Sequence, residues 1–168
     1  YILGVFVVGV IMSLITFAIG EIYIVSDGGT FLSAASFAEL LGVMLLSVLA
    51  SSSMVFFIVS FMSTASAFST ASTVIGTLIG FLMGIYLPVG TLPATVQWVI
   101  KLFPVSHAGA LMRQIMLRDP ISVSFAGVPE SYVEEFREMM GVTFTYGDYT
   151  ATPGTHILVL IAVSAVFF

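Results

Sequence analysis

The stretch YLPVGTLPATVQW, residues 86–98, interrupts a long apolar part of the sequence with two prolines, Pro88 and Pro93. Pro93 suits the first turn of a new helix, where its missing N–H costs nothing. Pro104 then stops this helix after a few apolar residues. A second short helix, capped by Ser106, is predicted over residues 107–118, and neither piece approaches the ~20 residues that a bilayer crossing needs. The pattern predicts a re-entrant helical hairpin over residues 88–118, which enters the membrane and leaves it on the same side.

The composition around this stretch is that of a membrane protein. Of the 168 residues, 59% are hydrophobic and 8% are charged, whereas soluble domains are near half apolar and about a quarter charged. No Asp, Glu, Lys, Arg or His occurs between Glu39 and Lys101. As one helix this run would be roughly 90 Å long, against a bilayer core of about 30 Å. The run must therefore cross twice, and it lacks the alternation of barrel strands.

Four membrane-spanning segments are predicted. The first covers residues 1–25 and ends in a turn at 26–29; the second covers 37–62, and the third covers 71–87. The serine- and threonine-rich stretch 60–73 is interpreted as the turn between the second and third spans, although such hydroxyl residues can also stay helical by bonding to preceding carbonyls. The fourth, 156–168, stops before it is long enough to span. We therefore expect an all-α polytopic membrane protein, and a fragment of a longer chain.

Residues 119–152 have the composition of a small soluble module. Residues 121–125 alternate as in a strand, and Ser131 with Glu134 forms a capping-box pattern for a helix that ends at Gly141. Residues 142–146 alternate again. The predicted organisation is three transmembrane helices over 1–87, the hairpin over 88–118, a small α+β cap over 119–152 and the start of a last transmembrane helix over 153–168.

Three glycines of the third span, Gly76, Gly80 and Gly84, follow one another at four-residue spacing. They would share one helix face, and small residues on such a face allow close helix contact in lipid. The alternative is that glycine is simply common in membrane helices. We favour a packing role because the spacing repeats.

The sequence offers little chemistry of its own. Lys101 is the only lysine and lies in no Walker A pattern, so this chain is not expected to hydrolyse ATP. His107 and His156 are far apart in the sequence and lack further ligands at metal spacing. We interpret His107 as a polar group at a helix start and His156 as an interfacial one, and expect no metal-binding, cofactor-binding or catalytic residue. Glu21 and Glu39 are interpreted as interfacial anchors, and no ionisable residue falls at a predicted membrane midplane, which disfavours a proton-driven carrier.

Residues 80–113, GFLMGIYLPVGTLPATVQWVIKLFPVSHAGALMR, resemble the late part of the membrane subunit of ABC-2 type exporters, the second type of ATP-binding-cassette exporter. The shared features are a glycine-bearing helix that ends in a proline, a Leu-Pro pair, a short apolar helix, and a proline before a second short helix. The residues that carry them here are Gly84, Pro88, Leu92, Pro93, Pro104, Ser106 and His107.

This resemblance implies a six-helix permease, of which the chain would be the third to sixth helices, with the cytoplasmic coupling helix before Tyr1. The hairpin, with Pro88, Leu92, Pro93, Pro104 and His107, would lie on the extracellular side together with the cap. A second permease subunit, the same or different, would complete the pathway. Cytoplasmic ABC ATPase subunits would bind ATP and Mg, so no cofactor is expected in this chain. The location implied is a cell membrane, in particular the bacterial plasma membrane.

The uncharged spans suit a route for an amphiphile such as a drug, a lipid or a lipid-linked glycan. Thr73, Thr77 and Phe81 form a stripe beside the glycine face and are the candidate pathway residues, although plain packing explains them equally well. Two other functions stay open. A membrane-embedded enzyme would use Glu39 with His107 or His156, and a structural scaffold of a secretion or cell-envelope system would use the cap to bind a partner.

Overall fold

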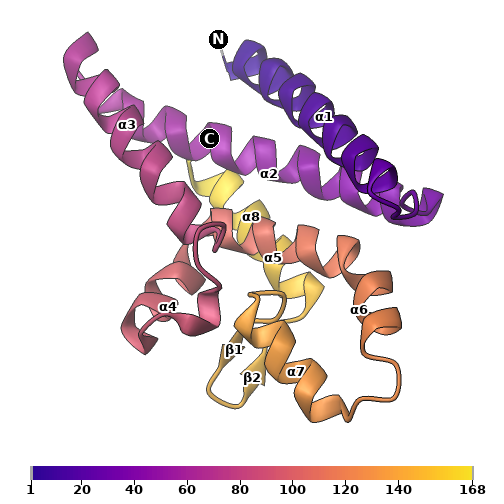
Figure 1. The fold of residues 1–168 in the computed structure, drawn as a ribbon. Helices are drawn as coiled ribbons and strands as arrows, with labels where there is room; N and C mark the ends of the chain where they lie inside the picture. The colour runs from indigo at the N-terminus through magenta and orange to yellow at the C-terminus, as the bar shows by residue number, and fades with distance from the viewer. Residues whose placement is uncertain (1, 168) are drawn as a thin grey trace.

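The computed structural model describes residues 2–167, which are mostly helical (Figure 1). The elements in chain order are α1 (Ile2–Ser26), α2 (Ala34–Ser60), α3 (Ala65–Leu82), the 3-10 turn η1 (Val89–Thr91), α4 (Ala94–Leu102), α5 (Pro104–Met116), α6 (Arg118–Ser124), α7 (Glu130–Met139), β1 (Thr145–Tyr146), β2 (Tyr149–Thr150) and α8 (Pro153–Phe167). The two strands form an antiparallel pair with Thr145 opposite Thr150.

Helices α1, α2 and α3 are each long and apolar enough to cross a membrane. On α1 large apolar side chains are exposed over most of the helix surface, as at Leu3 (74%), Ile11 (50%) and Ile22 (65%). In a soluble protein such a surface would be an aggregation hazard, whereas hydrocarbon solvates it. The chain is therefore a membrane protein with three candidate spans. Helix α8 has 15 described residues, and its role as a fourth span stays a prediction.

The prediction of a turn over residues 60–73 was wrong in extent. The turn is short, and α3 begins at Ala65 with the Thr64 side chain accepting a hydrogen bond from the Ala67 N–H. Within the helix the Thr73 hydroxyl donates to the Ser69 carbonyl at 3.0 Å. Hydroxyls that bond to the preceding turn in this way are compatible with helix, and in lipid they need no water.

The third span also ends earlier than predicted, at Leu82 rather than near Pro88. Gly84 adopts φ +65°, the Ile85 N–H donates to the Gly80 carbonyl and the Gly84 N–H donates to the Phe81 carbonyl. This pair of bonds is a Schellman motif, which needs a residue in the left-handed region at the position of Gly84. Glycine therefore ends α3, and Pro88 lies beyond it at the start of η1.

The cap has the predicted α+β character, with two corrections. Residues 121–125 are not a strand, because Arg118–Ser124 forms α6. Pro120 lies in its first turn, where a helix tolerates proline, and Ile121 alone in the helix is buried. The predicted capping box is absent as well, since Pro129 precedes α7 and no side chain caps it. The predicted end at Gly141 is confirmed, with φ +68°.

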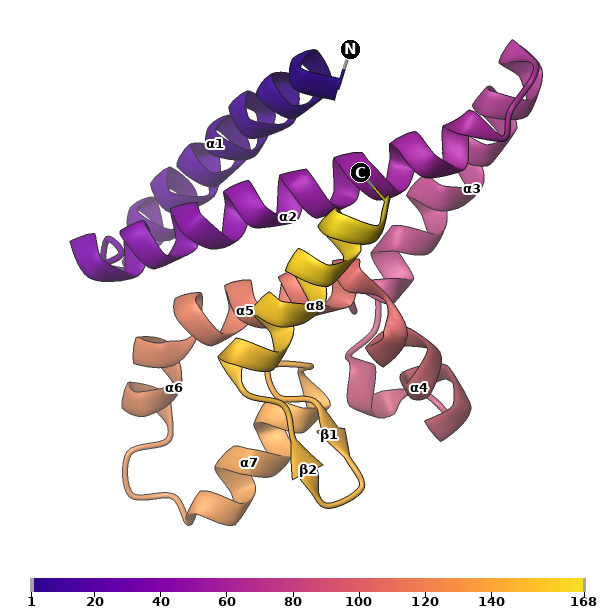
Figure 2. The same ribbon diagram turned by 180° about the vertical axis from the view of Figure 1, so that it is seen from behind.

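The core lies where α2, α5 and α8 meet. Figure 2 shows α8 rising from the strands to the middle of α2, with α5 beside it. The buried apolar side chains of this core are Leu40, Val43, Met44, Ala50, Ala108, Leu111, Ile115 and Leu160. The face of α2 also buries Ser47 and Ser53, whose hydroxyls bond back to carbonyls of the same helix. Small residues of this kind let helices approach closely in lipid.

Candidate functional site

The segment predicted as a hairpin around Pro104 contains α4 and α5, both shorter than a membrane span. We call this helix pair the hairpin, and its re-entrant course stays a prediction. Pro104 occupies the first turn of α5, as expected for a helix start. The prediction that Ser106 caps this helix was wrong. Its hydroxyl donates instead to the Leu82 carbonyl at 2.8 Å. Ser106 therefore joins the start of α5 to the last turn of α3 and satisfies one of the carbonyls that a helix end leaves open.

Arg113 of α5 reaches the same end of α3. Its guanidinium donates to the Met83 carbonyl. A Cβ on Gly84 would lie 3.6 Å from one guanidinium nitrogen, and a Cβ on Gly141 would lie 3.5 Å from another. The arginine thus lies close to glycines of two different segments. Its cation sits against a carbonyl at a helix C-terminus, where positive charge is favourable.

His107 and His156 form a buried pair between α5 and α8. Their Nδ1 atoms lie 2.7 Å apart, and the two side chains are 3% and 0% exposed. His107 lies in the first turn of α5, as predicted, but the interpretation of the two histidines as separate polar groups was wrong. The sequence separation of 49 residues hides a contact that the packing of α8 against α5 creates.

The hydrogen bonds around the pair determine which ring nitrogens carry a proton. His107 Nε2 lies 2.9 Å from the Lys101 carbonyl, which can only accept, so this nitrogen carries the proton. A neutral His107 then accepts at Nδ1, and His156 donates from its Nδ1. The remaining nitrogen of His156, Nε2, is buried and has no hydrogen-bond partner among residues 2–167. The pair therefore holds α8 to α5 through one directed hydrogen bond.

The cap is fastened to the hairpin at Lys101. The Lys101 ammonium donates to the Thr145 carbonyl at 2.8 Å, and the Tyr146 hydroxyl donates to the Lys101 carbonyl at 2.9 Å. Burial raises the pKa of the Tyr146 phenol, and the neighbouring Tyr149 raises it further, so the phenol keeps the proton that it donates. Phe144, 1% exposed, meets both histidine rings edge-on. The strands, the hairpin and α8 thus form one connected unit.

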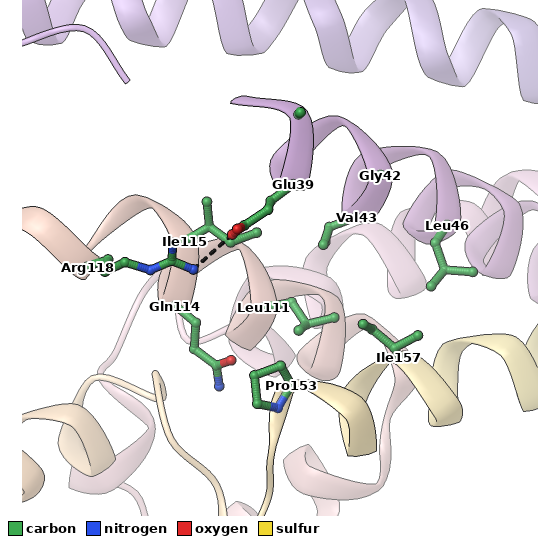
Figure 3. Close-up of a pocket in the computed structure, with 11 residues that line it drawn as sticks. Glu39, Gly42, Val43, Leu46, Leu111, Gln114, Ile115, Arg118, Pro153 and Ile157 are labelled. Carbon is green, nitrogen blue, oxygen red and sulfur yellow. Dashed lines mark hydrogen bonds and ion pairs between the residues drawn. The ribbon is translucent and has the colours of Figure 1, made fainter. Parts of the chain in front are cut away.

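A cavity of about 570 Å³ opens beside this unit, between α2, α5 and α8 (Figure 3). Its apolar lining comes from Val43, Leu46, Leu111, Ile115, Pro153 and Ile157. Glu39 and Arg118 lie at the same cavity and form an ion pair of 2.8 Å, with side chains 48% and 55% exposed. Gln114 adds a polar group, because its amide nitrogen donates to the Val142 carbonyl while its oxygen has no partner within the described part of the chain. The cavity is therefore apolar with charged and polar groups at one side, and its size fits an organic ligand.

The contacts of Glu39, His107 and His156 bear on the alternative that the chain is a membrane-embedded enzyme. Glu39 pairs with Arg118, and the two histidines pair with each other, so the acid and the bases are engaged separately. Within residues 2–167 no three His, Asp or Glu side chains gather as metal ligands.

A family model described as ABC-2 family transporter protein matches residues 1–168. The chain belongs to this family. No curated protein and no solved structure matches the chain. The resemblance seen in residues 80–113 is thereby confirmed over the whole length. The chain is a permease, the membrane component of an ABC transporter, and the family associates with ABC ATPase partners in general.

The candidate pathway residues of this ABC-2 permease lie away from the cavity. Thr73, Thr77 and Phe81 are exposed on α3, which in Figure 1 extends away from α5 and α8. The two threonine hydroxyls bond to carbonyls of their own helix, and the Phe81 ring packs edge-on against Tyr86. These residues face outward from the described chain, so a pathway role for them stays a prediction that needs a second subunit.

The three glycines predicted to share one face of the third span have three different environments. A Cβ on Gly76 would meet nothing within 4 Å, whereas one on Gly80 would lie 2.2 Å from the Tyr86 ring. Gly84 follows the helix in the Schellman motif and so does not continue the face of the other two. The packing role therefore rests on Gly76 and Gly80.

The remaining residues of the predicted hairpin lie at its bends. Pro88 and Leu92 flank η1, Pro93 immediately precedes α4, and Pro104 begins α5. For His156, Arg113 and Glu39, sequence reasoning missed the partners in the fold, which are His107, Met83 and Arg118. Their partners are 30 to 79 residues away in the sequence, and no local pattern signals such contacts.

Proposed function

We propose that this ABC-2 permease is the transmembrane subunit of an ATP-driven exporter that moves an amphiphilic substrate, such as a drug, a lipid or a lipid-linked glycan, across the cell membrane. The observation that carries the proposal is the cavity between α2, α5 and α8, with apolar walls and an ion pair beside them. An amphiphile presents the same two chemistries, an apolar body and a polar head.

The ion pair is suited to exchange partners with a polar head group. Because both side chains of the pair are half exposed, the pair contributes only about 0–1 kcal/mol to stability. A charged head group can therefore replace either partner at little cost. The apolar walls give the body of the substrate a surface comparable with lipid.

The membrane arrangement forms part of the same proposal. The pair α4 and α5 is a re-entrant hairpin on the extracellular side, the cap lies above it, and α8 begins the last of four crossings of this multi-pass chain in a bacterial plasma membrane. A second permease subunit, identical or different, faces α3, where Thr73, Thr77 and Phe81 are exposed. Cytoplasmic ATPase subunits bind ATP and Mg and supply the energy. The short hydrogen-bonded links between hairpin, cap and α8 favour their moving as one body.

The test uses the full-length protein, purified in mild detergent with any ATPase subunit that accompanies it and reconstituted in vesicles. We expect ATP hydrolysis that amphiphiles stimulate severalfold. Gly42 lines the cavity, and a Cβ there would meet nothing within 4 Å. Gly42→Leu should therefore fill the cavity without disturbing the fold and should reduce the stimulation.

Gly4→Leu is the matched control, because a Cβ at this exposed position of α1 also meets open space. It should leave the stimulation intact. Absence of an associated ATPase would contradict the exporter proposal, and equal stimulation of both variants would contradict the role of the cavity.

A further inference from the structure

A second groove, of about 450 Å³, lies between α1, α2 and α5. It shares no lining residue with the cavity of Figure 3. Four methionines from the three helices line it: Met12, Met44, Met112 and Met116. Thioether side chains are flexible and polarizable and adapt to ligands of different shapes. Methionines gathered from three helices therefore indicate a surface that accepts varied apolar groups.

Glu21 adds a negative charge to this groove. Its carboxylate accepts a hydrogen bond from the Leu32 N–H at 3.2 Å. Of the ion pairs in the described part of the chain, which are Glu39 with Arg118 and Glu130 with Arg137, neither involves Glu21. The charge of Glu21 is thus not neutralised by a neighbouring cation.

The basic residues of the sequence are all engaged elsewhere. Lys101 donates to the Thr145 carbonyl and Arg113 to the Met83 carbonyl. Arg118 and Arg137 each pair with a glutamate other than Glu21. Since the sequence holds four Lys and Arg residues in total, none of them is left to balance the negative charge of Glu21.

Phe17 lies in the same groove, with its ring 5.6 Å from that of Phe37. An aromatic face attracts a cation, most strongly one that has shed its water. The groove therefore combines an unbalanced carboxylate, an aromatic ring and adaptable thioethers. Anionic and zwitterionic ligands would find no positive group among these lining residues.

We propose that this groove binds lipophilic cations, in which a positive charge is carried on an apolar body, and that such cations are a substrate class of the permease. The inference rests on the proposed export function and names a substrate class for it. The carboxylate of Glu21 balances the charge, while the methionines and Phe17 contact the apolar body.

The test compares two ions of nearly equal size and shape and opposite charge, tetraphenylphosphonium and tetraphenylborate. Their binding to the purified full-length protein in detergent is measured by equilibrium dialysis without ATP. We expect the phosphonium to bind and the borate to bind at least about tenfold more weakly, because only the cation gains from the carboxylate.

Two variants locate the site. Glu21→Gln keeps an oxygen that can accept from the Leu32 N–H and removes the charge, so the dissociation constant of the phosphonium should rise about tenfold. Gly20 lines the groove, and a Cβ there would meet nothing within 4 Å. Gly20→Leu should therefore block the groove and weaken binding, whereas Gly4→Leu on the same helix should not. Glu134→Gln, on exposed α7, is the control for lost charge.

Equal affinity of the wild type for both ions, or equal affinity for the phosphonium in Glu21→Gln and Glu134→Gln, would overturn the inference. Unchanged phosphonium binding by Gly20→Leu would do the same. These results leave the export function intact if other amphiphiles still stimulate ATP hydrolysis. Loss of that stimulation for every amphiphile, with phosphonium binding retained, would instead count against export.

Discussion

At the scale of single residues, the contact between His107 and His156 joins the hairpin to the last helix. Each ring occupies a buried position, and one hydrogen bond of 2.7 Å connects them. A buried polar group that loses its partner costs about 1–3 kcal/mol, whereas replacing both partners by apolar groups can be nearly neutral. The pair therefore makes a double-mutant cycle informative.

We expect His107→Phe to lower the free energy of unfolding by about 1–3 kcal/mol, because it leaves the Nδ1–H of His156 without an acceptor. The double variant His107→Phe/His156→Phe should regain part of this loss, since no histidine nitrogen is then left unpaired. Unfolding is followed by the fluorescence of Trp98 in mixed micelles with increasing dodecyl sulfate.

Tyr149→Phe controls for the loss of an exposed polar group, because Tyr149 is 50% exposed and bonds only to Thr155 at the surface. If the losses of the two single histidine variants simply added in the double variant, the hydrogen bond would not be the link between α5 and α8.

The sequence predicted individual residues well only where their role is local. Pro93 precedes a helix start, Pro104 follows the end of α4 and Gly141 stands at a helix end, all as predicted, because these residues act through their own backbone. The start of the second short helix was misplaced, since α5 begins at Pro104 and not at His107. Ser106 was expected to act locally and instead bonds to Leu82, 24 residues away. Such bonds depend on how helices pack, which the local sequence does not encode.

At the scale of the helices, α3 contains the glycine face proposed to contact a second subunit. Gly76 is the better position for a test, because a Cβ there meets nothing within this chain, whereas one at Gly80 meets Tyr86. We expect Gly76→Leu to leave the fold of the chain intact and to weaken assembly of the full-length permease. Size-exclusion chromatography in detergent at decreasing protein concentration measures the assembly.

Val74→Leu is the matched control, since Val74 is 53% exposed on the same helix and points away from Gly76. It should leave assembly unchanged. Equal assembly of the Gly76→Leu variant and the wild type would show that the glycine spacing reflects composition alone.

Hydrophobic length predicted α1, α2 and α3, because a membrane demands long uncharged helices whatever their packing. Boundaries rich in serine and threonine were misplaced, since these hydroxyls satisfy themselves within a helix. Alternation over five residues was too short to distinguish the strand that we expected from α6. The hydrophobic period and length of a segment predict long helices, whereas the conformation of a short segment depends on the elements that it packs against.

At the scale of the whole molecule, α2, α5 and α8 of this ABC-2 family member enclose an apolar core. The sequence predicted neither the cavity of Figure 3 nor the methionine-lined groove. The cavity draws residues from α2, α5, α6 and α8, and the groove from α1, α2 and α5, and such spaces exist only once the helices have packed.

The central claim concerns the course of the chain through the membrane. If α1, α2 and α3 cross and α4 with α5 turns back, the turn after α1 and the cap share one surface, and the turn between α2 and α3 lies on the other. Asp27, Ser63 and Ser131 are exposed in these three regions. The sequence contains no cysteine, so a single introduced cysteine reports each region.

The most direct measurement is therefore labelling of Asp27→Cys, Ser63→Cys and Ser131→Cys, each in the full-length protein, with a maleimide that cannot cross the membrane. In intact cells we expect Asp27→Cys and Ser131→Cys to react, and Ser63→Cys to react only after the cells are permeabilised. Labelling of Ser131→Cys and Ser63→Cys from the same side, with Asp27→Cys protected, would contradict the re-entrant hairpin and the exporter arrangement built on it.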